Sequence, residues 1–322
     1  MLRKILSVLV ILSFGMILFG NFSVGISSIV EHPSLNAIRD GIIDYLKSSE
    51  LSNEIEIDFK CAQGDMKIAK SIADQFVSDN VDLIIGISTP VAQACAAATK
   101  EIPVLFSAVT DPIGAGLVAN MGLNEGNISG ISDLTPVLSQ FQLLKLCFPE
   151  TKKVGFIFNP SEANSVTILD LAKQAAEQLG MEIIEILGTT TTEMITSLNA
   201  TVGDIDAIYI GNDNTAASSI SSLGNIAEKN TKPIIAAFFD EGVLIGFGFD
   251  YYEVGLRTGE QALEILNGVN IEQIPSKILP AEVLELYIDI DLANIMGLEI
   301  PEAVIEKADM IIEHGEEIYS NN

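Results

Sequence analysis

The sequence of 322 residues contains no tryptophan, only two histidines and only three cysteines. Without tryptophan, any site that stacks on an aromatic ligand must use tyrosine or phenylalanine. The cysteines, Cys61, Cys95 and Cys147, are far apart and odd in number, so they match neither a metal site nor a disulfide framework. Each lies in or beside an apolar run, and we predict buried free thiols. Neither histidine has a partner at metal-ligand spacing.

Motifs of the common catalytic sites are also absent. No segment matches the GxSxG, HExxH or P-loop patterns, and Gly246-Phe247-Gly248 lacks the third glycine of a dinucleotide-binding fingerprint. We therefore expect no enzyme activity, no metal and no cofactor. A hydrolase or an isomerase stays open as an alternative only because α/β folds host many functions.

Positive charge is scarce, with 17 Lys and Arg against 44 Asp and Glu, and the formal net charge is −27. Phosphate binding needs clustered Lys and Arg, so this balance argues against a nucleic-acid partner. It favours a soluble, acidic surface. The same balance, with an apolar leader in place of a DNA-binding helix-turn-helix, argues against a repressor core.

Arg3 and Lys4 precede the apolar run ILSVLVILSFGMILFG, and the next charge is Glu31. A short basic start before an apolar run is typical of a secretory signal peptide, so we predict an extracytoplasmic protein cleaved near residues 20–23. Residues 1–22 retained as an N-terminal anchor are the alternative, because the run is near the lower limit for spanning a bilayer. No cysteine follows the run as a site for a lipid anchor.

Residues 81–118, VDLIIGISTPVAQACAAATKEIPVLFSAVTDPIGAGLV, predict a buried strand, a polar tip, a helix, a second buried strand and a second polar tip. Ser88 and Thr89 end the first strand as a predicted N-cap, and Pro90 suits the first helical position. Hydroxyls beside a helix N-terminus at the carboxyl edge of a parallel sheet favour a small anion. There is no Lys or Arg between Val81 and Lys100, so a carboxylate fits better than a polyphosphate. An ordinary βα turn is the alternative.

Strands and helices alternate along the rest of the chain, which predicts parallel sheets flanked by helices. The pattern runs once to Asp133 and starts again at Val154. The predicted strands are residues 24–30, 55–59, 81–87, 102–109 and 128–132, then 154–158, 182–187, 206–210 and 233–238. The predicted helices are residues 35–47, 65–78 and 91–99, then 162–179, 192–199 and 215–229.

The fold class that follows is α/β, with two Rossmann-like lobes and a ligand cleft between them. After Asp250 we expect an amphipathic helix at 251–266, a strand at 283–288 and a closing helix at 301–312. Crossings near Asp133, Asp250 and Pro280 would form a multi-crossover hinge. The predicted domains are residues 23–133 with 251–279 for lobe 1, and 134–250 with 280–322 for lobe 2.

Polar residues at the strand tips suit a zwitterion. Ser88, Thr89 and Thr110 suit a carboxylate, whereas Asp133, Asp213 and Asp240 could hold an ammonium group. The alternative is that each aspartate caps the next helix or turn. Paired aromatics near the crossings could contact an aromatic ligand or simply pack in the core: Phe238 and Phe239, Phe247 and Phe249, Tyr251 and Tyr252.

Six segments resemble the ABC-transporter substrate-binding family of the tryptophan/tyrosine-binding type: SSIVEHPSLNAIRDG (27–41), residues 87–118, NISGISDLTPV (127–137), NPSEANS (159–165), AIYIGNDNT (207–215) and GFDYYEVGLRTGE (248–260). The resemblance implies a type I periplasmic-binding-protein fold that delivers an aromatic amino acid to a membrane permease. The bulky tip at residues 237–241, and the missing lipid-anchor cysteine, depart from the family.

The resemblance implies that the tips at Ser88, Thr89 and Thr110 hold the ligand carboxylate and that the second lobe supplies the rest of the site. The predicted ligand-binding set is Glu31, His32, Ser88, Thr89, Pro90, Ser107, Thr110, Asp111, Asp133, Asn159, Asn164, Ser165, Asn212, Asp213, Asn214, Phe239 and Asp240.

The function we predict is capture of a small zwitterion, most consistent with tryptophan, tyrosine or phenylalanine, by hinge closure. The expected partners are the ligand and ABC permease subunits, and the expected state is a monomer. Ligand must favour the closed form, since equal affinity for both forms shifts nothing. A ligand-sensing ectodomain for signalling, or a receptor for a branched-chain amino acid or a nucleoside, are the alternatives.

Overall fold

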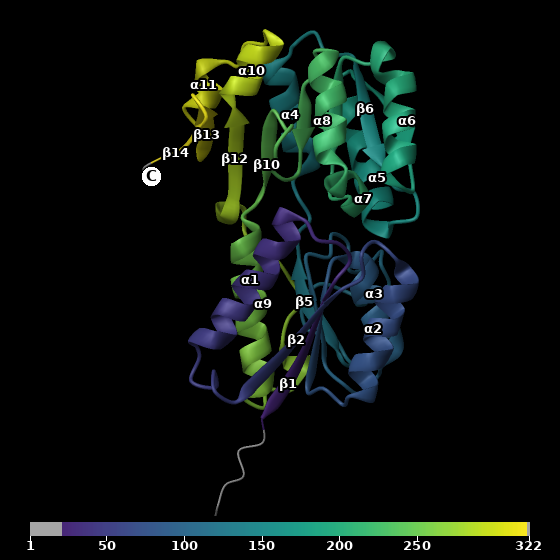
Figure 1. The fold of residues 1–322 in the computed structure, drawn as a ribbon, viewed down its shortest axis with the longest axis vertical. Helices are drawn as coiled ribbons and strands as arrows, with labels where there is room; N and C mark the ends of the chain where they lie inside the picture. Colours follow the sequence, from purple (N-terminus) through teal and green to yellow (C-terminus); the bar gives the residue numbers. More distant parts are fainter. Residues whose placement is uncertain (1–20, 321–322) are drawn as a thin grey trace, which may run out of the picture.

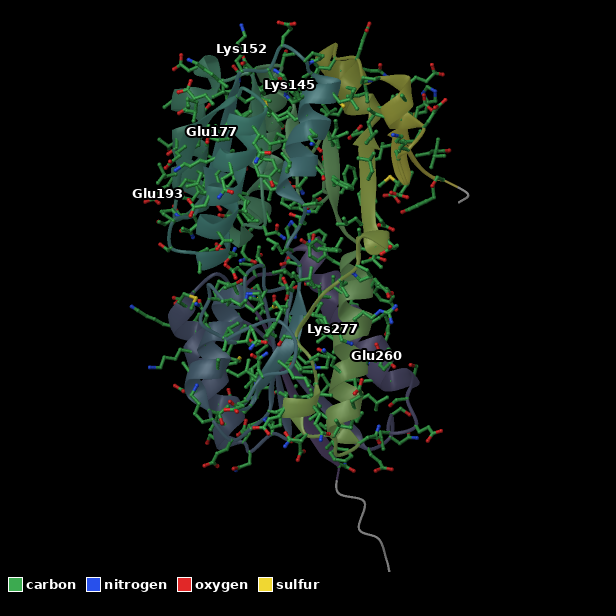
Figure 2. The ribbon with its side chains drawn as sticks, turned by 180° about the vertical axis from the view of Figure 1, so that it is seen from behind. Lys145, Lys152, Glu177, Glu193, Glu260 and Lys277 are labelled. Carbon is green, nitrogen blue, oxygen red and sulfur yellow. The ribbon has the colours of Figure 1, made fainter. Side chains whose placement is uncertain are left out.

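Two lobes, each built on one β-sheet, are stacked along the long axis of the molecule in the computed structural model, which describes residues 21–320 (Figure 1). The predicted signal peptide or anchor falls outside the described residues except for its last two, and Phe22 already begins the first strand. Charged side chains such as Lys152, Glu177 and Glu193 project outward from the surface (Figure 2). In the described part of the chain, no helix has the length and apolarity to cross a membrane.

Lobe 1 is built on a six-stranded parallel sheet in the order β11-β5-β4-β3-β1-β2. Every residue of the predicted central strand β3 is buried, as expected for a strand covered on both faces. The strands are β1 (Phe22–Ser28), β2 (Ile55–Cys61), β3 (Leu83–Ile87), β4 (Val104–Ser107), β5 (Ile128–Ser132) and β11 (Lys277–Ile278). The helices are α1 (Pro33–Ser48), α2 (Met66–Ser78), α3 (Thr89–Ala98) and α9 (Tyr251–Leu266).

Lobe 2 is built on an eight-stranded sheet in the order β14-β13-β12-β10-β9-β8-β6-β7, antiparallel only at β10/β12 and β13/β14. The strands are β6 (Lys153–Phe158), β7 (Glu182–Leu187), β8 (Ala207–Ile210), β9 (Ile234–Ala236), β10 (Ile245–Phe249), β12 (Leu284–Asp289), β13 (Met310–Glu313) and β14 (Glu316–Tyr319). The helices are α4 (Val137–Cys147), α5 (Ala163–Gln178), α6 (Thr191–Thr201), α7 (Asn214–Ser218), α8 (Ile220–Lys229), α10 (Ile290–Met296) and α11 (Glu302–Ile305).

The chain passes between the two sheets three times: after β5, after β10, and between β11 and β12. Helix α9 follows the second passage and packs along α1 (Figure 1). Glycines allow this close approach, because a Cβ on Gly255 would overlap the carbonyl oxygen of Ile38.

The carboxyl ends of the parallel strands of both lobes face the same space between the lobes (Figure 1).

Two predicted helices were wrong in part. The helix predicted at residues 301–312 ends at Ile305, and residues 310–313 instead form β13, which pairs with β12. The helix predicted at 215–229 is broken at Ser219, whose hydroxyl donates to Thr191 on α6 over 2.8 Å. Of the cysteines, Cys95 and Cys147 are buried, whereas Cys61 is only partly buried.

Candidate functional site

A cavity lies between the lobes, at the carboxyl ends of the strands. Its atom-free space is about 450 Å³, but the centre of a water molecule can reach only about 40 Å³ of it. The two lobes therefore leave little free space between these walls. The lining residues are Val30, His32, Ser34, Leu35, Ser88, Thr89, Ala108, Thr110, Asp133, Asn164, Asn212, Asp213, Asn214, Ala217, Phe238 and Tyr251.

Two hydroxyls on the lobe 1 wall have no hydrogen-bond partner. The side-chain oxygens of Ser88 and Thr89 are both buried and unbonded. Ser88 does not cap α3 through its side chain, so that part of the N-cap prediction was wrong. Its backbone has φ 79° and ψ 156°, a conformation that is almost confined to glycine. Both hydroxyls remain available to a ligand beside the N-terminus of α3.

Thr110 and Asp133 also belong to the cavity wall, but they are bonded to each other. The Thr110 hydroxyl donates to Oδ1 of Asp133 over 3.0 Å. Burial raises the pKa of the Asp133 carboxyl, while donors including Asn212 and Thr110 oppose that rise. Asp133 caps no helix, because the next helix, α4, has Pro136 at its N-cap position. The hydroxyl of Thr110 already donates to a protein acceptor.

On the lobe 2 wall, the carboxylate of Asp213 is fully buried. Its Oδ2 accepts from the backbone N–H of Asn159 and from the hydroxyl of Ser165, both over 2.6 Å. Its Oδ1 accepts from the N–H of Ala216 and so caps α7, as the capping alternative predicts. Burial and the charge of Glu162 raise the pKa of Asp213 to about 7. Asp213 therefore both shapes its own loop and faces the cavity.

Glu162 is a buried carboxylate that the sequence did not single out. Oε1 accepts from the N–H and the hydroxyl of Thr215, and Oε2 accepts from the side chains of Asn164 and Asn214. These bonds join two strand tips of lobe 2, the loop after β6 and the loop after β8. The Oδ1 atom of Asn164 is left without a partner in the cavity wall, where it can accept from a ligand.

His32 joins the two lobes beside the cavity. Its Nδ1 accepts from the N–H of Ser34 over 3.3 Å, which leaves the proton of the neutral ring on Nε2. Nε2 lies 3.3 Å from Oδ2 of Asp240, and the ring meets Phe238 edge-on with centroids 5.4 Å apart. Burial acts to raise the pKa of Asp240, but hydrogen bonds from His32 and from the N–H of Glu241 give a net lowering.

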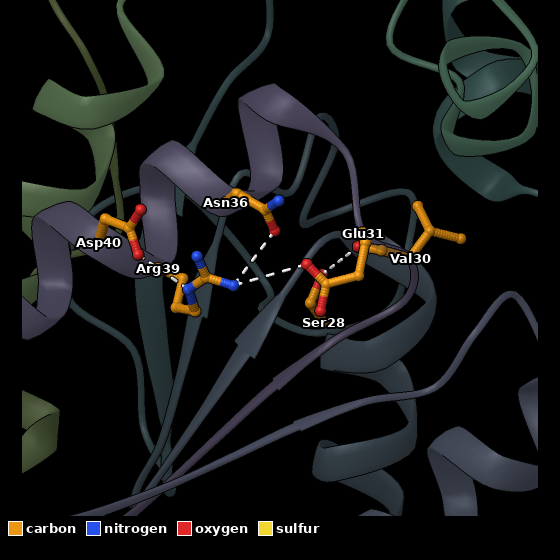
Figure 3. Close-up of polar contacts among 6 residues, drawn as sticks. All are labelled: Ser28, Val30, Glu31, Asn36, Arg39 and Asp40. Atoms are coloured by element: carbon orange, nitrogen blue, oxygen red, sulfur yellow. Dashed lines mark hydrogen bonds and ion pairs between the residues drawn. The ribbon is translucent and has the colours of Figure 1, made fainter.

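Nine of the seventeen predicted ligand-binding residues line the cavity, and eight do not: Glu31, Pro90, Ser107, Asp111, Asn159, Ser165, Phe239 and Asp240. Glu31 instead pairs with Arg39 at the surface (Figure 3). The hydroxyl of Ser107 lies 2.7 Å from that of Thr258 on α9. Glu31 and Ser107 therefore make contacts within lobe 1 and do not face the cavity.

The remaining members of that group hold the cavity wall from behind or lie next to it. Asp111 accepts from the Thr167 hydroxyl of α5 over 3.2 Å, a second contact between the lobes. Phe239 stacks on Tyr287 with ring centroids 5.2 Å apart and does not line the cavity. Its neighbour Phe238 lines the cavity instead. Pro90 and Asn159 line an adjoining groove.

Several lining residues were not in the predicted set. Val30, Ser34, Leu35, Ala108, Ala217, Phe238 and Tyr251 were missed. Phe238 and Tyr251 lie among the paired aromatics near the crossings, but that pattern did not separate them from core residues. The apolar ones carry no sequence signal, because an apolar residue at a strand end looks the same whether it faces a ligand or the core.

A family model described as ABC transporter substrate binding protein matches residues 23–312. The chain belongs to this family. The type I periplasmic-binding-protein fold predicted from the sequence is confirmed. Among curated relatives, a tyrosine-binding protein of Clostridioides difficile is 41% identical over 258 residues, which cover 79% of this chain and 75% of that protein.

Two solved structures of ABC substrate-binding proteins bear on the arrangement of the lobes. An ABC domain from Streptococcus pneumoniae in complex with L-Trp is 31% identical, has a TM-score of 0.86, and is matched over 91% of this chain and all of its own. A ligand-free, open substrate-binding protein with adhesive properties from Clostridium difficile is 37% identical, with a TM-score of 0.68 over 91% and 99% of the chains. The less identical structure superposes better, so the arrangement of this chain is more similar to that of the ligand complex than to that of the open structure.

Proposed function

We propose that this member of the family captures an aromatic L-amino acid, tyrosine or tryptophan, between its lobes and delivers it to an ABC permease. One observation carries the proposal. Unbonded hydroxyls on lobe 1 face a buried carboxylate and an unbonded amide oxygen on lobe 2 across one cavity. This polarity matches the two ends of an amino-acid zwitterion.

The ligand carboxylate would accept from the hydroxyls of Ser88 and Thr89 at the N-terminus of α3. Helix α3 is ten residues long, so its free N–H groups and its dipole favour a negative charge at this end. The described residues that line the cavity include no Lys or Arg. A single carboxylate suits such a wall better than a phosphate, which needs more positive charge.

The ligand ammonium group would donate to Asp213 and to Oδ1 of Asn164. The aromatic ring would lie against Phe238, Tyr251 and the apolar residues Val30 and Leu35, all of which line the cavity. Aromatic side chains favour edge-on or offset contacts with another ring. The relatives described as tyrosine-binding and as bound to L-Trp support an aromatic ligand.

The wider role that we propose is that of an extracytoplasmic receptor, monomeric and without catalysis, whose leader at residues 1–22 is removed or retained as an anchor. Lobe 1 would comprise residues 23–133 and 251–279, and lobe 2 residues 134–250 and 280–322. The membership of the two sheets supports these boundaries, because β11 pairs in the first sheet and β12 in the second. The family description supports the permease as the partner.

The test is the melting temperature of the purified protein with each of the twenty amino acids. A ligand at a thousandfold excess over its Kd stabilises the folded state by about 4 kcal/mol. We expect a shift with L-tyrosine or L-tryptophan and none with aspartate or lysine. Because the chain has no tryptophan, the fluorescence of bound L-tryptophan can be followed by selective excitation of its indole ring, without tryptophan emission from the protein. No shift with any amino acid would overturn the proposal, and sugars and nucleosides would be screened next.

A further inference from the structure

A buried polar cluster joins lobe 2 to two of the segments that pass between the lobes. Asp133 follows β5 at the first passage, and Tyr251 begins α9 at the second. Asn212 follows β8 in the interior of lobe 2. Asp133 and Asn212 are buried, with relative exposures of 4% and 9%. The hydrogen bonds of this cluster therefore depend on where lobe 2 lies relative to the hinge.

The side chain of Asn212 is bonded entirely to the hinge segments. Its Nδ2 donates to Oδ2 of Asp133 over 2.8 Å and to the hydroxyl of Tyr251 over 3.3 Å. Its Oδ1 accepts from the hydroxyl of Thr135 over 3.2 Å. The Tyr251 hydroxyl in turn donates to Oδ2 of Asp133 over 3.4 Å. Although Asn212 lines the cavity, its side-chain amide already has hydrogen-bond partners in the protein on both its nitrogen and its oxygen.

The cluster is also linked to the cavity through Asn164. The Nδ2 atom of Asn164 donates to the backbone carbonyl of Asn212 over 2.7 Å, while its Oδ1 is the unbonded atom of the cavity wall. A ligand donor that bonds to Oδ1 would fix the orientation of this amide. The same amide holds the loop that presents Asn212 to Asp133 and Tyr251.

Opening the lobes would move Asn212 away from the hinge segments. The polar groups of the cluster would then be exposed to solvent or left buried without a hydrogen-bond partner. Asp133 would lose its bond to Asn212 and keep the one from Thr110, which belongs to lobe 1. Burial and the nearby Asp133 raise the pKa of Tyr251 well above its ordinary value, so its hydroxyl keeps its proton and remains a donor. An unbonded buried polar group costs more than an ordinary hydrogen bond contributes.

We propose that Asn212 and Tyr251 are positioning residues that stabilise the closed arrangement through Asp133, so that they set how long a captured ligand is retained. This role rests on the proposed function. The amide of Asn212 and the hydroxyl of Tyr251 act on the hinge, whereas the ring of Tyr251 lines the cavity. The role of the two polar groups predicts an effect on release more than on capture.

The test compares Tyr251→Phe with Tyr252→Phe, a neighbouring change that removes a hydroxyl bonded to Asp44 within lobe 1. We would measure association and dissociation rates of L-tryptophan by its fluorescence, the melting temperature without ligand, and the radius of gyration by small-angle scattering with and without ligand. Tyr251→Phe should speed dissociation roughly two- to tenfold, the effect of one lost hydrogen bond, with little change in association. Asn212→Ala should speed it more, because it removes every bond from the amide.

Tyr252→Phe should leave dissociation unchanged, and the melting temperature without ligand shows whether each variant is folded. Dissociation at the wild-type rate in Tyr251→Phe, or equal effects of the two changes, would overturn the inference. If the wild-type protein binds neither L-tryptophan nor L-tyrosine, the proposed function is wrong. The hinge role of Asn212 and Tyr251 is then tested by the radius of gyration of the ligand-free proteins. A larger radius of gyration in Tyr251→Phe and Asn212→Ala than in wild type would support the role, and equal radii would refute it.

Discussion

The Nε2 atom of His32 lies 3.3 Å from Oδ2 of Asp240, and this pair joins the first loop of lobe 1 to lobe 2. The pair is sheltered, with side-chain exposures of 5% and 24%. A second contact between the lobes, from Thr167 to Asp111, connects α5 of lobe 2 to the loop after β4. Neither contact lies in the hinge segments, so both depend on how closely the lobes approach.

Replacing Asp240 by Asn should weaken ligand binding by about fivefold, since one sheltered hydrogen bond contributes about 1 kcal/mol. The reason is that the pair stabilises only the closed form, to which the ligand binds. Isothermal titration with L-tyrosine would measure the change. In a double-mutant cycle with His32→Gln, the two losses should be less than additive. Fully additive losses would mean that the pair is not coupled.

Replacing Ser88 by Gly should affect stability and binding in opposite directions. Glycine adopts the backbone conformation of Ser88 without strain, so the free protein should gain about 1 kcal/mol of stability. Loss of the hydroxyl should weaken ligand binding at least tenfold, because a hydrogen bond to a charged group contributes about 1.5–3 kcal/mol. Urea unfolding and titration calorimetry would measure the two effects.

The matched control for that change is Ser27→Ala. Ser27 also has a buried, unbonded hydroxyl, but it does not line the cavity. Its removal should leave ligand affinity unchanged. If Ser27→Ala weakens binding as much as Ser88→Gly does, the hydroxyl of Ser88 has no special place in the site.

Ligand affinity should rise with pH through about pH 7. Asp213 has a raised pKa of about 7 in the folded protein, because it is buried near Glu162, and it must be charged to hold an ammonium group. The other titratable groups of the cavity wall are His32, Asp133 and Tyr251. Affinity for L-tyrosine measured from pH 6 to pH 8 should therefore increase, and binding near pH 7 should release protons to the buffer.

The same raised pKa has the opposite effect on the free protein. Between the ordinary carboxyl pKa of about 4 and pH 7, the folded state binds more protons at Asp213 than the unfolded state does, so its contribution to stability falls as pH rises. Asp213→Asn should remove that part of the pH dependence. Glu285, whose pKa burial and Asp250 also raise to about 7, contributes with the same sign and remains in the variant. An unchanged stability profile in Asp213→Asn would contradict the assignment.

Replacing Gly255 by Ala should destabilise the protein by about 2 kcal/mol, because the new methyl group would overlap the carbonyl of Ile38 and push α9 from α1. Gly203→Ala is the control, since a Cβ there meets open space. Denaturant unfolding would compare the two. Equal stabilities would show that the helices can separate without cost.

Local pattern predicted most of the fold correctly. The apolar run that forms β3 and the polar residues after it are encoded within a few neighbouring positions, and alternation of strands and helices implies a sheet whose carboxyl edge carries those residues. The prediction of one helix over residues 301–312 was wrong for a physical reason. Val304 and Ala308 are buried at helical spacing, yet Ile311 and Ile312 pair with β12, whose edge exists only once the sheet of lobe 2 has formed.

The sequence by itself therefore determined which polar residues reach the edges of the two sheets, because that depends on strand length and local turns. Only the tertiary structure decided what each one does there. The hydroxyls of Ser88 and Thr89 are left unbonded, whereas Thr110 and Asn212 are bonded to Asp133, and this difference depends on distances between segments far apart in the chain. Glu162 and Phe238 also join the site only through tertiary structure, because the bonds of Glu162 link two loops of lobe 2 and the ring of Phe238 packs against His32 of lobe 1.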